Sequence, residues 1–312
     1  MSMSKLLNQF RSFYFRNYPD DMEIQINYFA IFGGLGWSID TSKPIEVLIK
    51  ELILQNYTIL NEKIEKLTCN EANNKRLLRA LAVGDRRIFS AFNHAGLNNG
   101  NGGAALKYLQ EKGLVSIEYS REEPAKASQV KHKLKRSVAR HRISHKVLFT
   151  QPFVRFWFYF IVPHAKAILT NNFEGFFKDF SQKQNSYTSL IFEELSEVLL
   201  NYHIRDANIV SSGSYWDAHI EIDILTITDK DEIYVGECKW KNHKVNKKEW
   251  HKILEKCEKL HIIPSQIVLF SKRGFSKELH SHAGKDVALY SSSDFNVLVK
   301  HIEKSELIEE FI

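Results

Sequence analysis

Two neighbouring runs of alternating apolar and polar residues constrain the fold of this chain more than any other feature. The first run is IEIDIL, residues 220–225, and the second is IYVGECKW, residues 233–240. Alternation with a period of two is typical of strands, and the polar residues TDKD at positions 228–231 lie between the runs as a turn. The pattern therefore predicts an antiparallel hairpin in the last third of the chain.

The predicted hairpin brings charged side chains together. Because successive side chains of a strand point to opposite faces, Glu237 and Lys239 share one face and Cys238 takes the other. Asp223, on the first strand, can lie across the hairpin on the face of Glu237. Two carboxylates and an ammonium group are costly to bury without partners, and a divalent cation would remove that cost. Mg²⁺ or Mn²⁺ is the expected cofactor, with Asp223, Glu237 and the backbone carbonyl of Cys238 as oxygen ligands.

These residue types, in this arrangement, indicate hydrolysis of a phosphodiester. A bound metal ion would polarise the phosphodiester and acidify a water molecule, and Lys239 would orient that water or stabilise the charge that develops at phosphorus. A Glu-x-Lys triplet is common by chance, so the interpretation depends on the two strands that carry the residues. A salt-bridged surface hairpin is the alternative.

Elements on both sides of the hairpin predict a mixed α/β domain over residues 176–312. An amphipathic helix over residues 187–201 places Glu193 or Glu194 ahead of the hairpin. The other predicted elements are a strand at 207–212, a helix at 245–260, strands at 266–271 and 287–291, and a closing helix at 293–302. The resulting order is αβββαβ with an extra βα unit, which is the core of the restriction-endonuclease fold.

Residues 69–150 predict a winged helix-turn-helix domain. Three short helices are expected at 73–83, from the cap Asp85 to about 96, and from 104 to 113, followed by strands at 114–120 and 145–150. The sequence LNNGNGG, residues 97–103, is the expected turn before the third helix. This plan makes the third helix available to a DNA major groove, although many such domains dock proteins instead.

A long basic run lies where the wing of that domain is expected. Residues 131–146 read KHKLKRSVARHRISHK and contain no acidic residue, and the whole chain carries a formal net charge of +6. Contact with DNA phosphates is favoured over simple solvation, because a surface that meets phosphates needs this composition. The candidate phosphate contacts are Lys131, Lys133, Lys135, Arg136, Arg140 and Arg142. Asn98, Asn101 and Lys107 are candidates for base edges, although Asn in a turn more often serves the backbone.

The rest of the chain predicts a helical N-terminal region, residues 1–68, and an aromatic linker, residues 151–175. Apolar spacing over residues 44–67 is typical of one helix, and the glycines in residues 29–37 indicate a turn rather than a phosphate-binding loop. The apolar run at 153–162 is too short to span a membrane, which favours a buried segment and no membrane partner. Three scattered cysteines and an N-terminus unlike a signal peptide fit the cytoplasm.

Several short sequences together resemble a known family. Phe192-Glu193, YWD at 215–217, EIDI at 221–224 and GECKW at 236–240 are similar to the C-terminal PD-(D/E)XK nuclease-like domain of archaeal-type ATPases. PFVRFWFYFIVPH, residues 152–164, looks like the linker that joins a winged helix to that domain, so the resemblance covers about residues 70–300.

The resemblance implies a role for each matching residue. It makes Asp223 and Glu237 metal ligands, Lys239 the catalytic lysine and Glu193 an auxiliary acid on the first helix of the domain. The chain departs from the family at Gln151, where the linker usually has Asp, and in the absence of the ATPase module before the winged helix. An ATP-driven mechanism is therefore not expected.

The sequence thus predicts a Mg²⁺- or Mn²⁺-dependent DNA nuclease, with DNA held by the winged helix and the basic loop. Cleavage of both strands by one active site per chain would favour a homodimer. The alternatives are a non-enzymatic DNA-binding regulator whose nuclease-like domain dimerises, and a protein-interaction module. Trp216 and Trp240, which flank the hairpin, are expected to pack in the core rather than to stack on bases.

Overall fold

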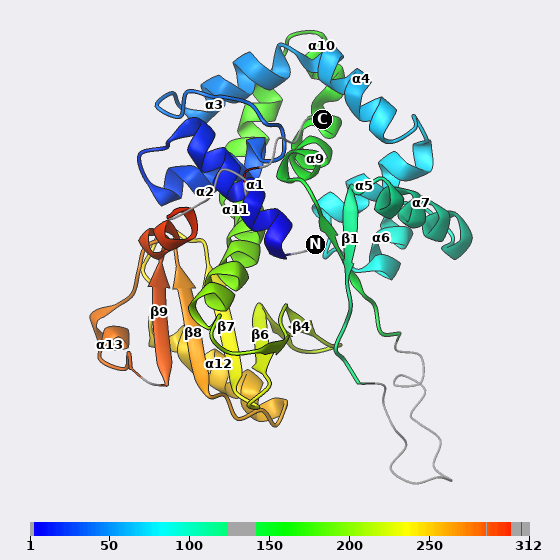
Figure 1. The fold of residues 1–312 in the computed structure, drawn as a ribbon. Coiled ribbons are helices and arrows are strands. Elements are labelled where there is room, and N and C mark those ends of the chain that lie inside the picture. Colours follow the sequence, from blue (N-terminus) through cyan, green and yellow to red (C-terminus); the bar gives the residue numbers. More distant parts are fainter. Residues whose placement is uncertain (1–2, 124–141, 285, 301–306, 308–312) are drawn as a thin grey trace, which may run out of the picture.

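The computed structural model describes residues 3–123, 142–284, 286–300 and 307, and its fold is drawn in Figure 1. The N-terminal region is helical, as predicted. Helix α1 (Met3–Asn17) is followed by α2 (Met22–Phe32), which begins where Asp21 Oδ1 accepts a hydrogen bond of 2.8 Å from the N–H of Ile24. Gly33 and Gly34 end α2 in the predicted turn, and Gly34 has a φ of +87°, which favours glycine.

The single helix predicted over residues 44–67 is wrong in one respect, because the structure divides it. It forms α3 (Ile45–Leu48), the π-helical η1 (Ile49–Leu54) and α4 (Tyr57–Leu67). The Asn56 side chain lies at the break and donates to the carbonyls of Glu51 and Leu52, at 2.9 and 3.3 Å. A short amide side chain that bonds to the backbone in this way competes with continuation of a helix.

The next region contains the predicted three helices and hairpin. In the described part of residues 69–150 these are α5 (Ala72–Val83), α6 (Ile88–His94), α7 (Asn99–Glu111), β1 (Val115–Glu118) and β2 (Lys146–Phe149). The two strands pair antiparallel, with Val115 opposite Phe149. Asp85 is not the cap of α6. It precedes the Arg87 N-cap, and its carboxylate accepts from the N–H of Arg87 at 3.1 Å.

The prediction of a turn over residues 97–103 is wrong from Asn99 onwards, where α7 has already begun. Asn98 caps this helix by accepting a hydrogen bond of 2.8 Å from the N–H of Asn101. Gly102 faces Phe92 of α6 so closely that a Cβ atom would lie 2.6 Å from the ring. Gly102 therefore allows two helices to approach, which the composition alone does not distinguish from a turn.

The aromatic segment after β2 is helical and buried. It forms α9 (Pro152–Phe156), η2 (Trp157–Ile161) and α10 (Val162–Leu169). Phe153, Phe156 and Phe160 have no exposed surface, so the expectation of a buried aromatic segment is confirmed. The same hydrophobic core contains residues of α1, α2, α5, α7 and the C-terminal sheet.

The C-terminal part is built on a mixed sheet. Helix α11 (Glu174–His203) precedes β3 (Ile209–Ser211), the small antiparallel pair β4 (Tyr215–Trp216) and β5 (Glu221–Ile222), β6 (Ile224–Thr228) and β7 (Ile233–Lys239). Then come α12 (Lys247–Lys259), β8 (Gln266–Ser271), α13 (Lys277–His280), β9 (Val287–Ser291) and the 3₁₀ helix η3 (Ser292–Val299). Within the described residues, the main sheet has five strands in the order β3-β6-β7-β8-β9. Strands β3, β6 and β7 pair antiparallel, and β7, β8 and β9 pair parallel.

Three predicted elements differ in detail. The strand expected over residues 220–225 is divided, with β5 pairing with β4 and β6 starting only at Ile224. The helix expected at 187–201 belongs to α11, which is twice that length. The closing helix expected at 293–302 is the 3₁₀ helix η3 as far as Val299, and residues 301 and 302 lie outside the described residues.

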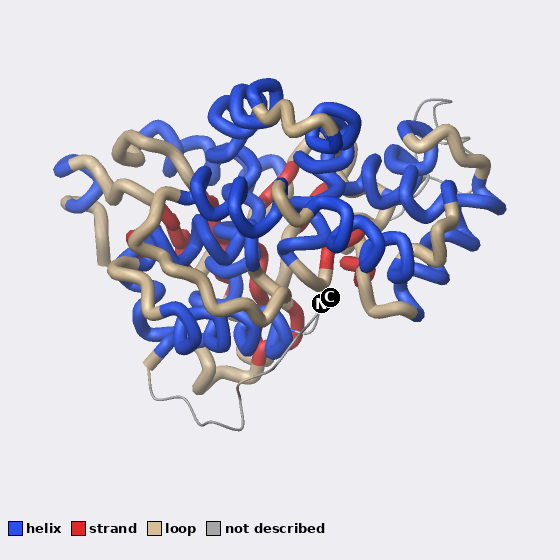
Figure 2. Tube along the Cα trace, turned by 90° about the horizontal axis from the view of Figure 1, so that it is seen from above, coloured by secondary structure: helices blue, strands red, loops and turns tan. Residues whose placement is uncertain are grey.

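The two faces of the sheet pack against different helices. Alternate residues of β7 and β8, such as Cys238 and Phe270, belong to the core on the α11 side, whereas Val235 and Leu269 pack with Ile253 of α12. Figure 1 shows α11 running from the helical N-terminal region onto the sheet, and in Figure 2 helices lie around the strands. Among the described residues, no helix is both long and apolar enough to cross a membrane.

Candidate active site

The predicted acidic residue Asp223 lies in a bend between β5 and β6. Its Oδ2 accepts a hydrogen bond of 2.8 Å from the backbone N–H of Cys238, which joins the start of β6 to the end of β7. The β6–β7 ladder begins with Ile224 opposite Gly236, so Asp223 lies beside Glu237 as the hairpin predicts. Burial, the Glu237 carboxylate and the Glu193 carboxylate together raise the pKa of Asp223 well above its ordinary value.

Glu237 is buried and held by two lysines. Lys239 contacts its Oε1, and the ammonium of Lys256, from α12, lies 2.7 Å from its Oε2. Lys239 also lies 3.7 Å from Oε2 of Glu249. Burial by itself lowers the pKa of Lys239, but the surrounding carboxylates outweigh this and raise it above its ordinary value. Lys239 is therefore an ammonium ion at neutral pH, and it shares the α12 side of the sheet with Glu237 as predicted.

The backbone of Cys238, rather than its thiol, faces Asp223. In a strand, the N–H and C=O of one residue point to the same edge, and the N–H of Cys238 points to Asp223. The carbonyl of Cys238 therefore faces the edge where Asp223 lies, beyond the last β6–β7 pair. Burial, together with the neighbouring Asp223 and Glu193 carboxylates, raises the pKa of the Cys238 thiol well above its ordinary value, which disfavours the thiolate form.

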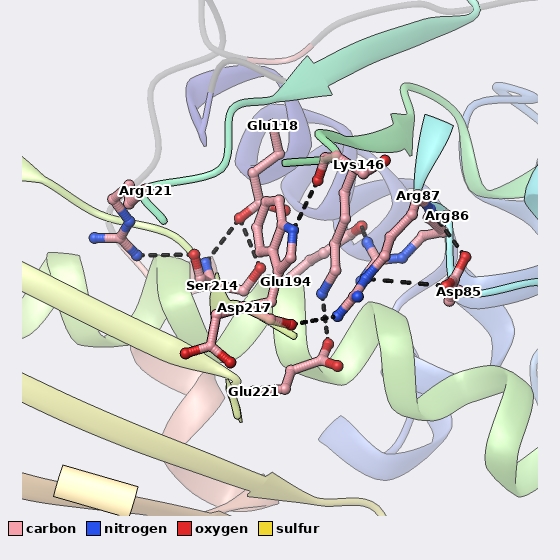
Figure 3. Close-up of polar contacts among 12 residues, drawn as sticks. Asp85, Arg86, Arg87, Glu118, Arg121, Lys146, Glu194, Ser214, Asp217 and Glu221 are labelled. Carbon is pink, nitrogen blue, oxygen red and sulfur yellow. Dashed lines mark hydrogen bonds and ion pairs between the residues drawn. The ribbon is translucent and has the colours of Figure 1, made fainter. Parts of the chain in front are cut away.

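The other predicted acid, Glu193, lies on α11 in a group of buried charges that Figure 3 shows in part. Burial raises the pKa of Glu193, and Arg86 opposes that shift. Its neighbour Glu194 lies 3.8 Å from Nη1 of Arg86, and burial raises the pKa of Glu194 to about 7. Helix α11 thus presents two carboxyl groups that are hard to ionise at the end of the sheet.

A buried lysine completes this group. Lys146 of β2 is 1% exposed, contacts Oε1 of Glu221 and lies 4.4 Å from the centre of the Trp216 ring. Lys146 lowers the pKa of Glu221, against the effect of burial. The last residue of the basic run is therefore part of the interior and is not available to phosphates.

The donor set can be compared with the needs of Mg²⁺ or Mn²⁺. Both prefer oxygen ligands, usually one or two carboxylates completed by water and phosphate oxygens. Asp223, Glu237 and the Cys238 carbonyl match that preference, and burial together with the neighbouring carboxylates raises the pKa of Asp223, so a cation beside it would favour its charged form. Across the described residues, no group of three or more His, Cys, Asp or Glu side chains is placed so that it could hold a metal ion.

The predicted DNA contacts are placed in part. Asn98 serves as the cap of α7, and Asn101 and Lys107 are exposed on this helix, with Lys107 3.8 Å from Glu111. Arg142 is exposed, and its guanidinium lies 5.7 Å from the centre of the Phe89 ring. Lys131, Lys133, Lys135, Arg136 and Arg140 lie outside the described residues.

A polar pocket of about 520 Å³ lies between α6, the start of α7 and the segment before β2. Its walls contain both basic and amide side chains beside an aromatic ring. They are formed by Asp85, Arg87, Phe89, Ser90, Asn93, Asn99, Arg142 and Ser144. The pocket lies close to the segment between β4 and β5, because Arg87 in its wall also donates to the carbonyl of Asp217 at 3.3 Å.

Sequence reasoning missed three basic residues, Arg86, Lys146 and Lys256. Lys256 is marked only weakly in the sequence, as one of several lysines on an amphipathic helix. Lys146 was visible as the end of a basic run, but nothing in the run distinguishes a buried lysine from a solvated one. Arg86 has a left-handed backbone, with φ of +65°, and carries no sequence signal of that conformation. Both tryptophans are buried, at 1% for Trp216 and 3% for Trp240, which confirms that they pack in the core.

Residues 157–253 match the model of a family described as archaea bacterial proteins of unknown function. The match covers a little under a third of the chain and includes Glu193, Asp223, Glu237 and Lys239. No curated protein and no solved structure matches the chain.

Proposed function

We propose that this protein is a Mg²⁺- or Mn²⁺-dependent nuclease that hydrolyses phosphodiester bonds of DNA. The observation that carries the proposal is the half-buried Asp223 carboxyl, joined to the end of β7 and flanked by Glu237 and Lys239. The element order α11, β3, β6, β7, α12, β8 supports a restriction-endonuclease-like domain. The arrangement of α5, α6, α7, β1 and β2 supports a winged helix that holds the DNA.

Each residue of the site has a definite part in the proposed reaction. Asp223, Glu237 and the carbonyl of Cys238 would hold the metal ion, which supplies Lewis acidity and lowers the pKa of water. Lys239, charged and fixed beside Glu237, would position the attacking water and stabilise the negative charge that grows on the phosphoryl oxygens. Exposed Asn101 and Lys107 on α7 would contact the duplex away from the scissile bond.

One observation favours a second candidate, a DNA-binding protein without catalysis. Both oxygens of Glu237 contact an ammonium group, Lys239 on one side and Lys256 on the other. A carboxylate satisfied in this way can be purely structural, and the nuclease-like domain would then serve dimerisation.

A plasmid-nicking assay tests the proposal. We expect supercoiled plasmid to be nicked in Mn²⁺ or Mg²⁺ by the wild type, and Asp223→Asn and Lys239→Ala to lose at least about 100-fold in rate. Lys230→Ala, an exposed lysine in the β6–β7 turn, is the matched control and should keep wild-type activity. Thermal melting confirms that each variant folds.

The outcomes separate the candidates. Cleavage that survives Asp223→Asn would remove this site from the reaction. Tight DNA binding by a folded wild type without nicking in either metal would favour the non-enzymatic protein.

A further inference from the structure

The ion pair between Lys256 and Glu237 occupies a carboxylate oxygen that the proposed function assigns to a metal ion. Lys256 lies in the last turn of α12, and its ammonium is 2.7 Å from Oε2 of Glu237, while Lys239 takes Oε1. A divalent cation on the same carboxylate would stand next to two ammonium groups, and like charges at that distance repel strongly when they are partly buried. One of the two lysines must therefore leave when a metal ion binds.

The surroundings of the two lysines indicate which one leaves. Lys239 is on the strand, is 19% exposed and has a second acidic neighbour, Glu249, at 3.7 Å. Lys256 is more exposed, at 27% of its side chain, and extends from a helix beside the sheet. Its long flexible side chain can swing toward solvent without moving the backbone.

A released Lys256 side chain would join a row of lysines on the same helix. Lys248, Lys252 and Lys256 are spaced four residues apart on α12, so they lie along one side of the helix. Lys248 and Lys252 are exposed, and Lys252 lies 2.8 Å from Glu249, which is itself near Lys239. The row therefore leads from solvent to the carboxylate of Glu237, and a phosphodiester backbone is the polyanion that fits such a row.

We infer that Lys256 is an exchangeable counter-ion: it neutralises Glu237 in the metal-free site and becomes a ligand of a DNA phosphate when a divalent cation takes its place. This inference rests on the proposed nuclease function. It assigns Lys256 as a positioning residue that couples metal loading to DNA binding, because each event favours the displacement of Lys256 from Glu237.

Direct metal binding tests the first half. Mn²⁺ binding to the full-length, DNA-free protein is measured by calorimetry for wild type, Lys256→Met and Lys259→Met, an exposed lysine of the same helix turn. We expect Lys256→Met to bind Mn²⁺ about tenfold more tightly than wild type, which corresponds to about 1.4 kcal/mol. Lys259→Met should match the wild type, and adding Asp223→Asn to Lys256→Met should abolish the binding.

DNA binding tests the second half. DNA affinity is measured in Ca²⁺, which is chosen to fill the metal site without supporting cleavage. Under these conditions Lys256→Met should bind duplex DNA about three- to tenfold more weakly than wild type. The slope of its log affinity against log salt concentration should also be smaller. Lys256→Arg should retain most of the wild-type affinity, because it keeps the charge. If Lys256→Met melts early, Lys256→Gln provides the same measurements.

The outcomes distinguish this inference from the proposed function. Unchanged or weaker Mn²⁺ binding by Lys256→Met, or by Lys256→Gln where it replaces Lys256→Met, overturns the inference, even if the wild type nicks plasmid. Tighter, Asp223-dependent Mn²⁺ binding supports the exchange of Lys256 for metal even if the wild type cuts no DNA, and only the nuclease proposal then fails. Tighter Mn²⁺ binding with unchanged DNA affinity and salt slope overturns the role of Lys256 as a phosphate ligand.

Discussion

At the scale of single residues, the buried carboxyl groups of α11 and the sheet edge are the most unusual feature of this protein. Asp223, Glu193 and Glu194 all have a raised pKa, and burial is the largest cause in each case. Ionising a carboxyl group away from water costs free energy. Such groups are found at functional sites, where a shifted pKa is useful, or beside basic side chains that stabilise the charged form. Arg86 and Arg155 supply that compensation for Glu194.

Glu194 should make stability fall as pH rises. Its pKa is raised from 4.5 to about 7, so the contribution is fully present below 4.5 and is lost as pH rises through 7. Glu194→Gln does not titrate and should not lose this stability. Between pH 4.5 and 7, its free energy of unfolding should therefore rise relative to that of the wild type by up to about 3 kcal/mol. Urea denaturation at a series of pH values measures it.

Glu111→Gln is the control for that series, because Glu111 is exposed on α7. It makes the same substitution at a solvent-facing position. A Glu194→Gln difference that is flat with pH would contradict the raised pKa of Glu194.

At the scale of elements, α7 shows how glycine can serve helix packing. Gly102 lies against the ring of Phe92, whereas Gly103, one position later, has no atom within 4 Å of where its Cβ would be. Both are helical, so the same substitution has opposite physical consequences at neighbouring positions. The close approach of α6 and α7 holds the helix that is proposed to meet DNA.

Gly102→Ala and Gly103→Ala form a matched pair. The added methyl group at 102 must push Phe92 aside, and we expect a loss of about 1–3 kcal/mol in the free energy of unfolding. At 103 the methyl group meets open space and improves helix propensity, so a gain of about 0.5–1 kcal/mol is expected. Chemical denaturation followed by tryptophan fluorescence measures both, and equal effects at the two positions would disprove the packing explanation.

At the scale of the whole molecule, polar contacts join the three-helix region to the sheet. Arg121, just after β1, donates to the carbonyls of Gly213, Ser214 and Leu225 at 2.7, 2.9 and 2.9 Å. Glu118 accepts from both the N–H and the hydroxyl of Ser214, at 2.7 and 2.8 Å. These contacts reach the segment that leads to Asp223, so they position the site as well as connecting two parts of the chain.

Arg121→Ala should weaken this connection. It removes a donor from the carbonyls of Gly213, Ser214 and Leu225, of which Gly213 keeps the N–H of Leu225 at 2.8 Å. We expect the protein to lose about 2–3 kcal/mol in the free energy of unfolding. Arg205→Ala, an exposed arginine after α11, should change it by less than about 0.5 kcal/mol. Equal denaturation midpoints for the two variants would show that the contacts of Arg121 do not hold the parts together.

The sequence predicted the elements whose signal is local. Strands β8 and β9 have the predicted bounds, because short apolar runs between turn residues have few other interpretations. Alternation also placed Glu237 and Lys239 on one face and Asp223 beside Glu237. The break at Asn56, the early start of α7 and the bend at Asp223 depend on side-chain bonds and close approaches that no periodicity encodes.

Contacts between distant segments explain the rest of what was missed. Lys256 reaches Glu237 only because α12 packs on the same face of the sheet, and Lys146 reaches Glu221 only because β2 lies beside the β4–β5 pair. A lysine paired with a buried glutamate and a lysine in a solvated loop look the same in sequence. Their roles become distinct only when the tertiary structure shows their neighbours.

The phenylalanine-rich helices α9 and η2 have a practical consequence for anyone who divides this protein. Their rings pack against α2 and α5 on one side and against α11 on the other. A protein fragment that ends near residue 150, or one that starts near residue 176, would expose a large hydrophobic surface to solvent. Exposed hydrophobic surface of this kind promotes aggregation. Activities of the two halves are therefore best dissected by point substitution in the intact polypeptide.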